Sequence, residues 1–182
     1  CYFHFVRQWQ QLVDQGKLGK IYYGEGEYIH EIIDLLVNEE TGQYHWRHER
    51  PPIWYCAHTL GPVLMLMNDR IVKACGLTSG FNKKPDYSDH PGFLDFEIGL
   101  FKTEKGNVVK ILRSQTATRP HMVWYSLYGT KGHLENQRDP LNEGPGLYYS
   151  ADDMKSYDKA DRFFCTKSDP DAAARLLELA RA

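Results

Sequence analysis

Residues 96–113 read FEIGLFKTEKGNVVKILR, and this stretch decides the fold class. Side chain types alternate up to Phe101, Glu104 to Asn107 have turn composition, and an apolar run returns from Val108. Alternation with a period of two is typical of a strand, and two such runs around a glycine-containing turn predict a β-hairpin. The fold is therefore expected to contain antiparallel strands.

The rest of the chain adds two helices and more strands to this hairpin. Apolar residues recur at helical spacing from Tyr2 to Val13, ahead of Gly16, and a second helix is predicted with Thr59 as its N-cap. Its buried side is predicted to consist of Leu60, Val63, Leu64 and Met67. Strands are predicted over residues 20–29, 70–76 and 122–128. This order predicts an α+β fold, a largely antiparallel open sheet with helices on one face.

A single domain over residues 1–182 is expected, because a chain of 182 residues that is 42% hydrophobic can bury one substantial core. Residues 136–161 are rich in turn formers and are predicted to be a loop, while Asp169 and Pro170 predict the start of a last helix. The missing initiator Met and the absence of a cap after this last helix lead us to expect a domain truncated at both ends.

Composition excludes several classes of partner. A net charge of -2 with interspersed signs offers no basic surface, so nucleic acid is not expected. No apolar run approaches the ~20 residues that a membrane-spanning helix needs, so no membrane contact is expected either. The cysteines at 1, 56, 75 and 165 lack C-x-x-C spacing, which favours reduced thiols and a cytoplasmic location, with two disulfides as the open alternative.

Candidate site residues lie in the first third of the chain. Tyr28 and His30 share one face of a strand, because side chains two apart point the same way. His58 lies at a helix N-terminus, where the positive end of the dipole favours a neutral imidazole that can accept a proton, and Tyr55 precedes it by one turn. From spacing alone, a structural role stays open for each of them: a core tyrosine and histidines satisfied by neighbours.

A metal site is a weaker interpretation of the same region. His30, His45, His48, His58, Glu27, Glu31 and Glu49 carry suitable ligand atoms. None of them follows a recognised spacing such as H-E-x-x-H, so no metal is predicted.

Several motifs, taken in order, carry a family resemblance. They are Gly16 to Lys20, Tyr28-Ile29-His30, Tyr55-x-x-His58-x-Leu60-Gly61-Pro62, Arg119-Pro120 and Gly129 to Gly132. This ordered set resembles the C-terminal half of Gfo/Idh/MocA-type NAD(P)-dependent oxidoreductases. Within that superfamily it is most similar to the branch with NAD-dependent glycosidases of the α-N-acetylgalactosaminidase type.

The resemblance implies a function and a set of roles. It implies that a parent protein binds NAD or NADP on an N-terminal Rossmann domain, and that this domain builds the sugar pocket and forms a homo-oligomer through its open sheet face. It implies that His58 is the general base, with Tyr28 and Tyr55 bordering the catalytic site. The implied substrate-binding residues are His30, Arg47, Arg50, Arg119 and His121.

Departures from the family pattern refine these expectations. Trp54 stands where many dehydrogenases of the superfamily carry an aspartate, which favours the glycosidase-like branch. No G-x-G-x-x-G fingerprint occurs, so this chain alone is expected to bind no cofactor and to be inactive. The primary hypothesis is the substrate domain of a sugar oxidoreductase. The alternatives are an NAD-dependent glycosidase acting by oxidation, elimination and addition, and a non-enzymatic sugar-binding or scaffold module.

Overall fold

The computed structural model describes residues 3–32, 35–36, 38, 40–48, 50–80, 94–117, 119–138, 146–151 and 163–165, the last three by their backbone. The helices are α1 (His4–Asp14), the 3-10 helix η2 (Pro52–Tyr55) and α2 (Ala57–Met67). The strands are β1 (Ile21–Ile29), β2 (Ile71–Thr78), β3 (Phe96–Thr103), β4 (Val108–Ser114), β5 (Met122–Gly129), β6 (Gly132–Asn136), β7 (Gly146–Ser150) and β8 (Phe163–Cys165).

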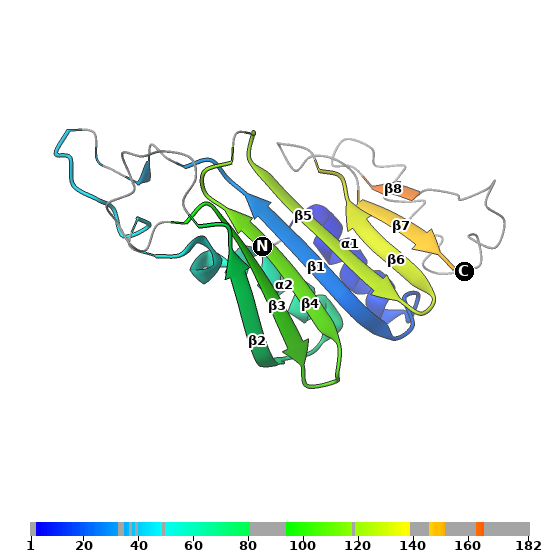
Figure 1. Cartoon of the computed structure of the whole chain (residues 1–182). Helices are drawn as coiled ribbons and strands as arrows, with labels where there is room; N and C mark the ends of the chain where they lie inside the picture. The colour runs from blue at the N-terminus through cyan, green and yellow to red at the C-terminus, as the bar shows by residue number, and fades with distance from the viewer. Residues whose placement is uncertain are drawn as a thin grey trace.

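The strands form one open sheet in the order β2-β3-β4-β1-β5-β6-β7-β8. Only the β1–β4 pair among the described strands is parallel, and α1 and α2 lie on the same face of the sheet (Figure 1). The predicted α+β class and the helices on one face are thus confirmed. Among the residues with a described structure, no helix is long and apolar enough to span a membrane.

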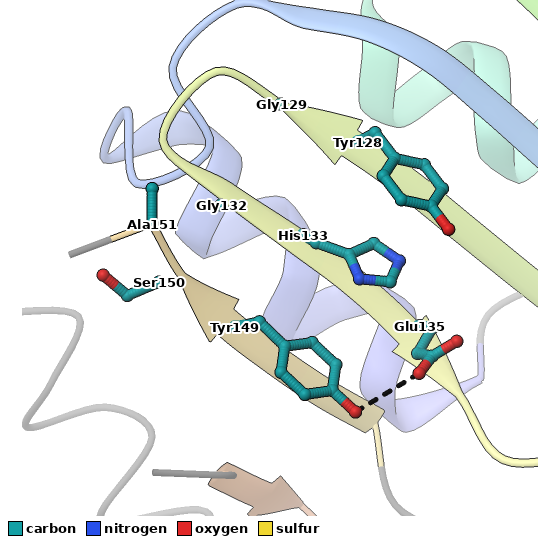
Figure 2. Close-up of a pocket in the computed structure, with 8 residues that line it drawn as sticks. All are labelled: Tyr128, Gly129, Gly132, His133, Glu135, Tyr149, Ser150 and Ala151. Atoms are coloured by element: carbon teal, nitrogen blue, oxygen red, sulfur yellow. Dashed lines mark hydrogen bonds between the residues drawn. The ribbon is translucent and has the colours of Figure 1, made fainter. Parts of the chain in front are cut away.

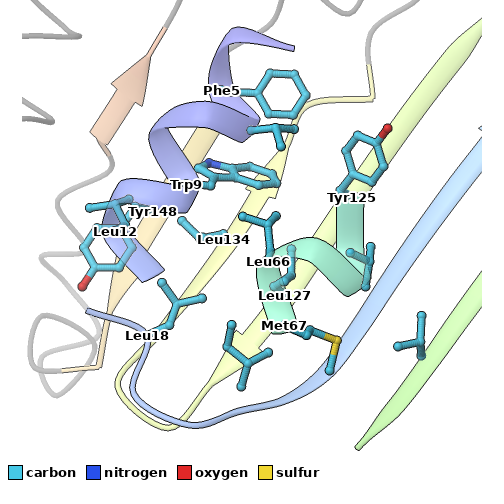
Figure 3. Close-up of a cluster of buried hydrophobic side chains, with 14 of the residues drawn as sticks. Phe5, Trp9, Leu12, Leu18, Leu66, Met67, Tyr125, Leu127, Leu134 and Tyr148 are labelled. Atoms are coloured by element: carbon cyan, nitrogen blue, oxygen red, sulfur yellow. The ribbon is translucent and has the colours of Figure 1, made fainter. Parts of the chain in front are cut away.

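The core fills the space between the two helices and the sheet. Figure 3 shows Phe5 and Trp9 of α1 and Leu66 of α2 pointing toward the same strands, where Tyr125 and Leu127 meet them. The first helix is the predicted one, and it ends before Gly16, which has a positive φ of 71°. A left-handed residue just past a helix is a common stop signal, and glycine adopts it without a steric cost.

Close approach of α2 to β1 depends on two glycines. A Cβ atom at Gly24 would lie 2.7 Å from Cγ1 of Val63, and one at Gly26 would lie 3.1 Å from Cβ of Thr59. The hydroxyl of Tyr125 donates a hydrogen bond of 2.6 Å to the backbone oxygen of His58 and ties the start of α2 to β5. These contacts hold the first turn of α2 over the centre of the sheet.

The start and the buried side of α2 differ from the prediction. The helix begins at Ala57 with Cys56 as N-cap, and Thr59 lies inside the first turn, where its hydroxyl donates to the oxygen of Cys56. The Thr59 side chain is buried against Gly26, so it packs on the sheet and does not cap the helix. Val63 and Met67 are buried as predicted. Leu60 and Leu64 are only half-buried, and Leu66, which was not predicted to be buried, is.

Residues 136–161 are not wholly a loop, because β7 lies within them. Gly146 starts this strand under α1, where a Cβ atom would come within 2.9 Å of Nε1 of Trp9. Tyr148 pairs with Leu134 and joins the core. Gly146, which has the composition of a turn residue in the sequence, therefore allows β7 to pack closely against α1. The predicted helix after Asp169 lies outside the described residues.

The hairpin of β3 and β4 forms as predicted, with Gly106 in its turn at a φ of 85°. Its alternation, however, turns Glu97 and Gly99 toward the helices and Ile98 and Leu100 toward the uncovered face. Because Phe96, Ile98 and Leu100 all lie on that face, it differs from an ordinary solvent-facing surface.

Candidate functional site

The predicted tyrosines and histidines of the first third of the chain come together at the carboxyl end of β1. The ring of Tyr28 meets the ring of His58 edge-on at 5.8 Å between centroids, and it meets His121 in the same way at 5.1 Å. Tyr55, at the end of η2, lies 4.8 Å from the ring of His58. Residues from β1, η2, α2 and the segment before β5 thus form one cluster, which we call the Tyr28 cluster.

Tyr28 and His30 share a face, as their spacing predicts. Their rings are stacked with centroids 5.4 Å apart, and the Tyr28 hydroxyl lies 3.1 Å from Nδ1 of His30. The direction of that hydrogen bond depends on the imidazole tautomer. The ring of His30 also meets His121 edge-on at 4.6 Å. Both histidines are therefore held against Tyr28 in fixed orientations.

The histidines of the cluster are held in their neutral form. Burial, with added repulsion from His121 and Arg113, lowers the pKa of His30 to about 4. Burial also lowers the pKa of His58 and of His121, and the cation of Arg113 contributes to both shifts. His58 lies in the first turn of α2, where the helix dipole acts in the same direction. Neutral imidazoles can accept protons or hydrogen bonds at neutral pH.

Arg113 is a member of the cluster that the sequence analysis did not select. It is only 1% exposed, its guanidinium carbon lies 3.9 Å from the centre of the Tyr28 ring, and one terminal nitrogen donates to the oxygens of Tyr28 and Ser114. The sequence does indicate its burial, because Val109, Ile111 and Arg113 alternate along one face of β4 and the first two are core residues.

A small cavity of about 70 Å³ opens beside the cluster. It is lined by Tyr28, His30, Ile32, Trp46, Arg47, Arg50, Pro51, Trp54, Tyr55, Arg113 and Gln115. The predicted Arg47 and Arg50 are thus brought to the site, each with its guanidinium over a tryptophan ring, at 4.6 Å from Trp46 and 5.2 Å from Trp54. The rings of His58 and His121 contact Tyr28 but do not line this cavity. Arg119 is exposed and does not line it either.

A larger hollow of about 490 Å³ lies on the opposite, uncovered face of the sheet. Figure 2 shows Tyr128, His133 and Tyr149, from the neighbouring strands β5, β6 and β7, along its floor. These rings stack nearly parallel, with centroids 4.1 Å and 5.4 Å apart. Size alone does not make this hollow the reaction site, because it has one histidine, whereas three imidazoles meet the ring of Tyr28 at the end of β1.

The donor set of the Tyr28 cluster fits a polyhydroxylated molecule. It offers neutral imidazoles, phenol hydroxyls and arginine donors, which bind and orient sugar hydroxyls. Within the described ranges, no three His, Cys, Asp or Glu side chains are grouped as metal ligands. The cluster also has no glycine-rich loop before a helix of the kind that cradles a dinucleotide phosphate.

Comparison with known proteins finds a curated relative at 30% sequence identity and solved structures of the same fold at lower identity. An α-N-acetylgalactosaminidase of Shewanella oneidensis is 30% identical over 82% of this chain and 38% of its own length. An oxidoreductase domain protein of Kribbella flavida superposes with a TM-score of 0.68 at 16% identity, over 91% of this chain and 46% of that one. Levoglucosan dehydrogenase in complex with NADH and L-sorbose gives 0.66 at 12% identity, over 96% and 53%.

These matches have two consequences. The solved structures share the fold at low identity, and the chain spans well under half the length of the galactosaminidase. The GFO/IDH/MocA C-terminal domain family matches residues 6–135, which include β1, α2, the β3–β4 hairpin and β5 and therefore the whole Tyr28 cluster. The chain therefore belongs to the GFO/IDH/MocA C-terminal domain family.

Proposed function

We propose that this chain is the sugar-binding part of an NAD(P)-dependent oxidoreductase that acts on a hydroxyl-bearing carbon of a sugar. The convergence of His58, Tyr28, Tyr55 and His121 at the carboxyl end of β1 carries this proposal. It provides a neutral base beside two phenol hydroxyls, which is what removal of a hydroxyl proton from a bound sugar requires.

His58 is the proposed general base. Burial keeps its pKa below the ordinary value, so the imidazole is unprotonated and able to take a proton at neutral pH. Tyr28 and Tyr55 orient sugar hydroxyls next to it. His30 forms part of the pocket wall, and Arg47, Arg50, Arg119 and His121 are the remaining proposed substrate contacts.

A nicotinamide cofactor would supply the hydride acceptor in the complete enzyme. We propose that it binds on a Rossmann domain of a longer protein, since this chain covers only 53% of a levoglucosan dehydrogenase of the same fold. Levoglucosan dehydrogenase, which shares this fold, has been solved with NADH. The residues of this chain would bind the sugar, orient it and remove its proton.

A second candidate is NAD-dependent glycoside cleavage by oxidation, elimination and addition. The name of the Shewanella oneidensis relative favours it, since that protein is an α-N-acetylgalactosaminidase. Trp54 lines the cavity, and the family resemblance places it where many dehydrogenases carry an aspartate, which favours this candidate too. His58 would have the same role in both candidates, because both begin by removing a hydroxyl proton.

We also propose that a second copy of the chain covers the open face of the sheet. That face carries a continuous row of rings from Tyr23 through Tyr128 and His133 to Tyr149, in register across four neighbouring strands. Leu100 adds exposed apolar surface to the same face. Aromatic residues are enriched in protein interfaces, which supports this placement.

The test is turnover by the complete protein with NAD or NADP and a panel of sugars and aryl glycosides. Formation of reduced cofactor would support the oxidoreductase. Release of free sugar without net reduced cofactor would support the glycosidase. Sugar binding without turnover under either cofactor would contradict both candidates and favour a non-enzymatic binding module.

A further inference from the structure

Three arginines surround the small cavity beside the Tyr28 cluster. Arg47, Arg50 and Arg113 line it, and none of its described lining residues is Asp or Glu. Its volume of about 70 Å³ is several times the roughly 10–15 Å³ that one buried water needs. A small substituent such as a carboxylate fits this space, whereas a whole sugar ring does not.

Among the three arginines, Arg113 is the one that is fully buried. Its side chain is almost completely buried, yet no salt bridge to it occurs within the described part of the chain. One terminal nitrogen donates to two backbone oxygens, while buried Nε has no hydrogen-bond partner among the described residues. A buried cation without a counter-charge is costly, so a site that retains one is expected to receive an anion.

Gln115 provides a second, independent polar atom in the same cavity. Its side chain is 4% exposed, and its Oε1 has no hydrogen-bond partner among the described residues. The backbone oxygen of Gln115 accepts a hydrogen bond of 3.0 Å from Ile32, which extends the β1–β4 pairing by one step and fixes the residue beside Arg113. Arg113 and Gln115 therefore both line the cavity, and each has one buried polar atom without a hydrogen-bond partner among the described residues.

A carboxylate with an adjacent hydroxyl has the acceptor and the donor that complement these two side chains. Building on the proposed function, we propose that the substrate is an acidic sugar whose carboxylate enters this cavity and accepts hydrogen bonds from Arg113, while a neighbouring hydroxyl donates to Oε1 of Gln115. Arg47 and Arg50, at the cavity wall, add positive potential on the path into it. The sugar ring then lies outside the cavity, toward Tyr28 and His58.

The inference is tested by titrating the complete protein with D-glucuronate, D-glucose and acetate in a calorimeter at equal ionic strength. Because a hydrogen bond to a charged group contributes more than one between neutral groups, glucuronate is expected to bind at least about tenfold more tightly than glucose. Acetate is expected to bind much more weakly than glucuronate, since it lacks the ring contacts and the hydroxyl.

The variant Gln115→Glu places a carboxylate inside the cavity next to Arg113. It is expected to raise the melting temperature and to reduce the preference for glucuronate over glucose to about onefold, because the internal carboxylate competes with the ligand. Gln11→Glu, an equal change of charge on the exposed side of α1, should leave the preference unchanged. Arg113→Gln should also remove the preference, and the Glu variant keeps the test valid if this one fails to fold.

Four results would overturn the inference: equal affinity for glucose and glucuronate, equal affinity for acetate and glucuronate, no binding of any of the three, or an unchanged preference in a folded Gln115→Glu variant. Each leaves the proposed function standing if the complete protein still oxidises or cleaves neutral sugars. The proposed function fails on a different observation, the absence of turnover with every sugar.

Discussion

His30 lies between Tyr28 and His121, and its pKa of about 4 is far below the ordinary value of 6.5. Between these two values the unfolded chain binds a proton that the folded chain does not, so protonation favours unfolding. The free energy of unfolding is therefore expected to fall as the pH is lowered from about 6.5 toward about 4. Burial lowers the pKa of His58, His121 and His133 as well, which adds to the fall in the same direction.

The variant His30→Gln isolates this contribution. Thermal unfolding followed at about pH 7.5 and about pH 5 should show a smaller drop in melting temperature for the variant than for the parent chain, because one of the protonation sites is gone. An equal drop in both proteins would show that His30 is not held neutral by its surroundings.

Residues of the site could be selected from the sequence only where their type and position were both informative. Tyr28, His30, Tyr55 and His58 stood at the ends of expected elements and within family-like motifs, and the structure gathers them into one cluster. Arg113 was missed because an arginine at a strand end is usually solvent-facing. Its alternation with Val109 and Ile111 placed it on the buried face of β4, but its pairing with Tyr28 follows from the sheet register, which no local pattern contains.

At the scale of elements, the β1–α2 contact positions the site, since it sets the first turn of α2 above Tyr28. Gly24→Ala is expected to destabilise the chain by about 1–3 kcal/mol, because the new methyl group would lie 2.7 Å from Val63. Gly61→Ala lies in the same helix with no heavy atom within 4 Å, and it should stabilise the chain by about 0.5–1 kcal/mol.

Urea unfolding of both variants measures this difference. A similar small effect of both substitutions would mean that α2 does not pack on β1 as closely as described. If Gly61→Ala lowers the free energy of unfolding more than Gly24→Ala does, the side of α2 that carries Gly61 faces the sheet, contrary to the structure.

Element types were predictable where a periodic run was long, as in α1, the β3–β4 hairpin and β5. The sequence did not reveal β7, because Gly146 and the prolines before it have turn composition and the strand depends on packing against Trp9. It also missed the true start of α2, since the packing of Thr59 against Gly26 outweighs its capping preference. Both errors come from tertiary contacts that override local preference.

At the scale of the whole molecule, the sheet has one face covered by helices and one that is uncovered (Figure 1). If a second copy covers the open face, Leu100→Lys should shift the chain toward the monomer in sedimentation velocity, because a charge would enter the interface. Met65→Lys is a matched control on α2, with 41% of the side chain exposed against 43% for Leu100, and it should leave the mass unchanged. A monomeric parent chain, or an equal effect of both variants, would contradict the proposed interface.

If the sugar reacts at the Tyr28 cluster, substitution of His58 and of His133 must affect turnover differently. In the complete protein with its cofactor, His58→Gln is expected to lower kcat by about 10²–10⁴-fold with a smaller change in KM, because a general base acts in the transition state. His133→Gln, on the opposite face of the sheet, should keep kcat within a few-fold of the parent. An unchanged kcat for His58→Gln, or an equal loss for His133→Gln, would contradict the account.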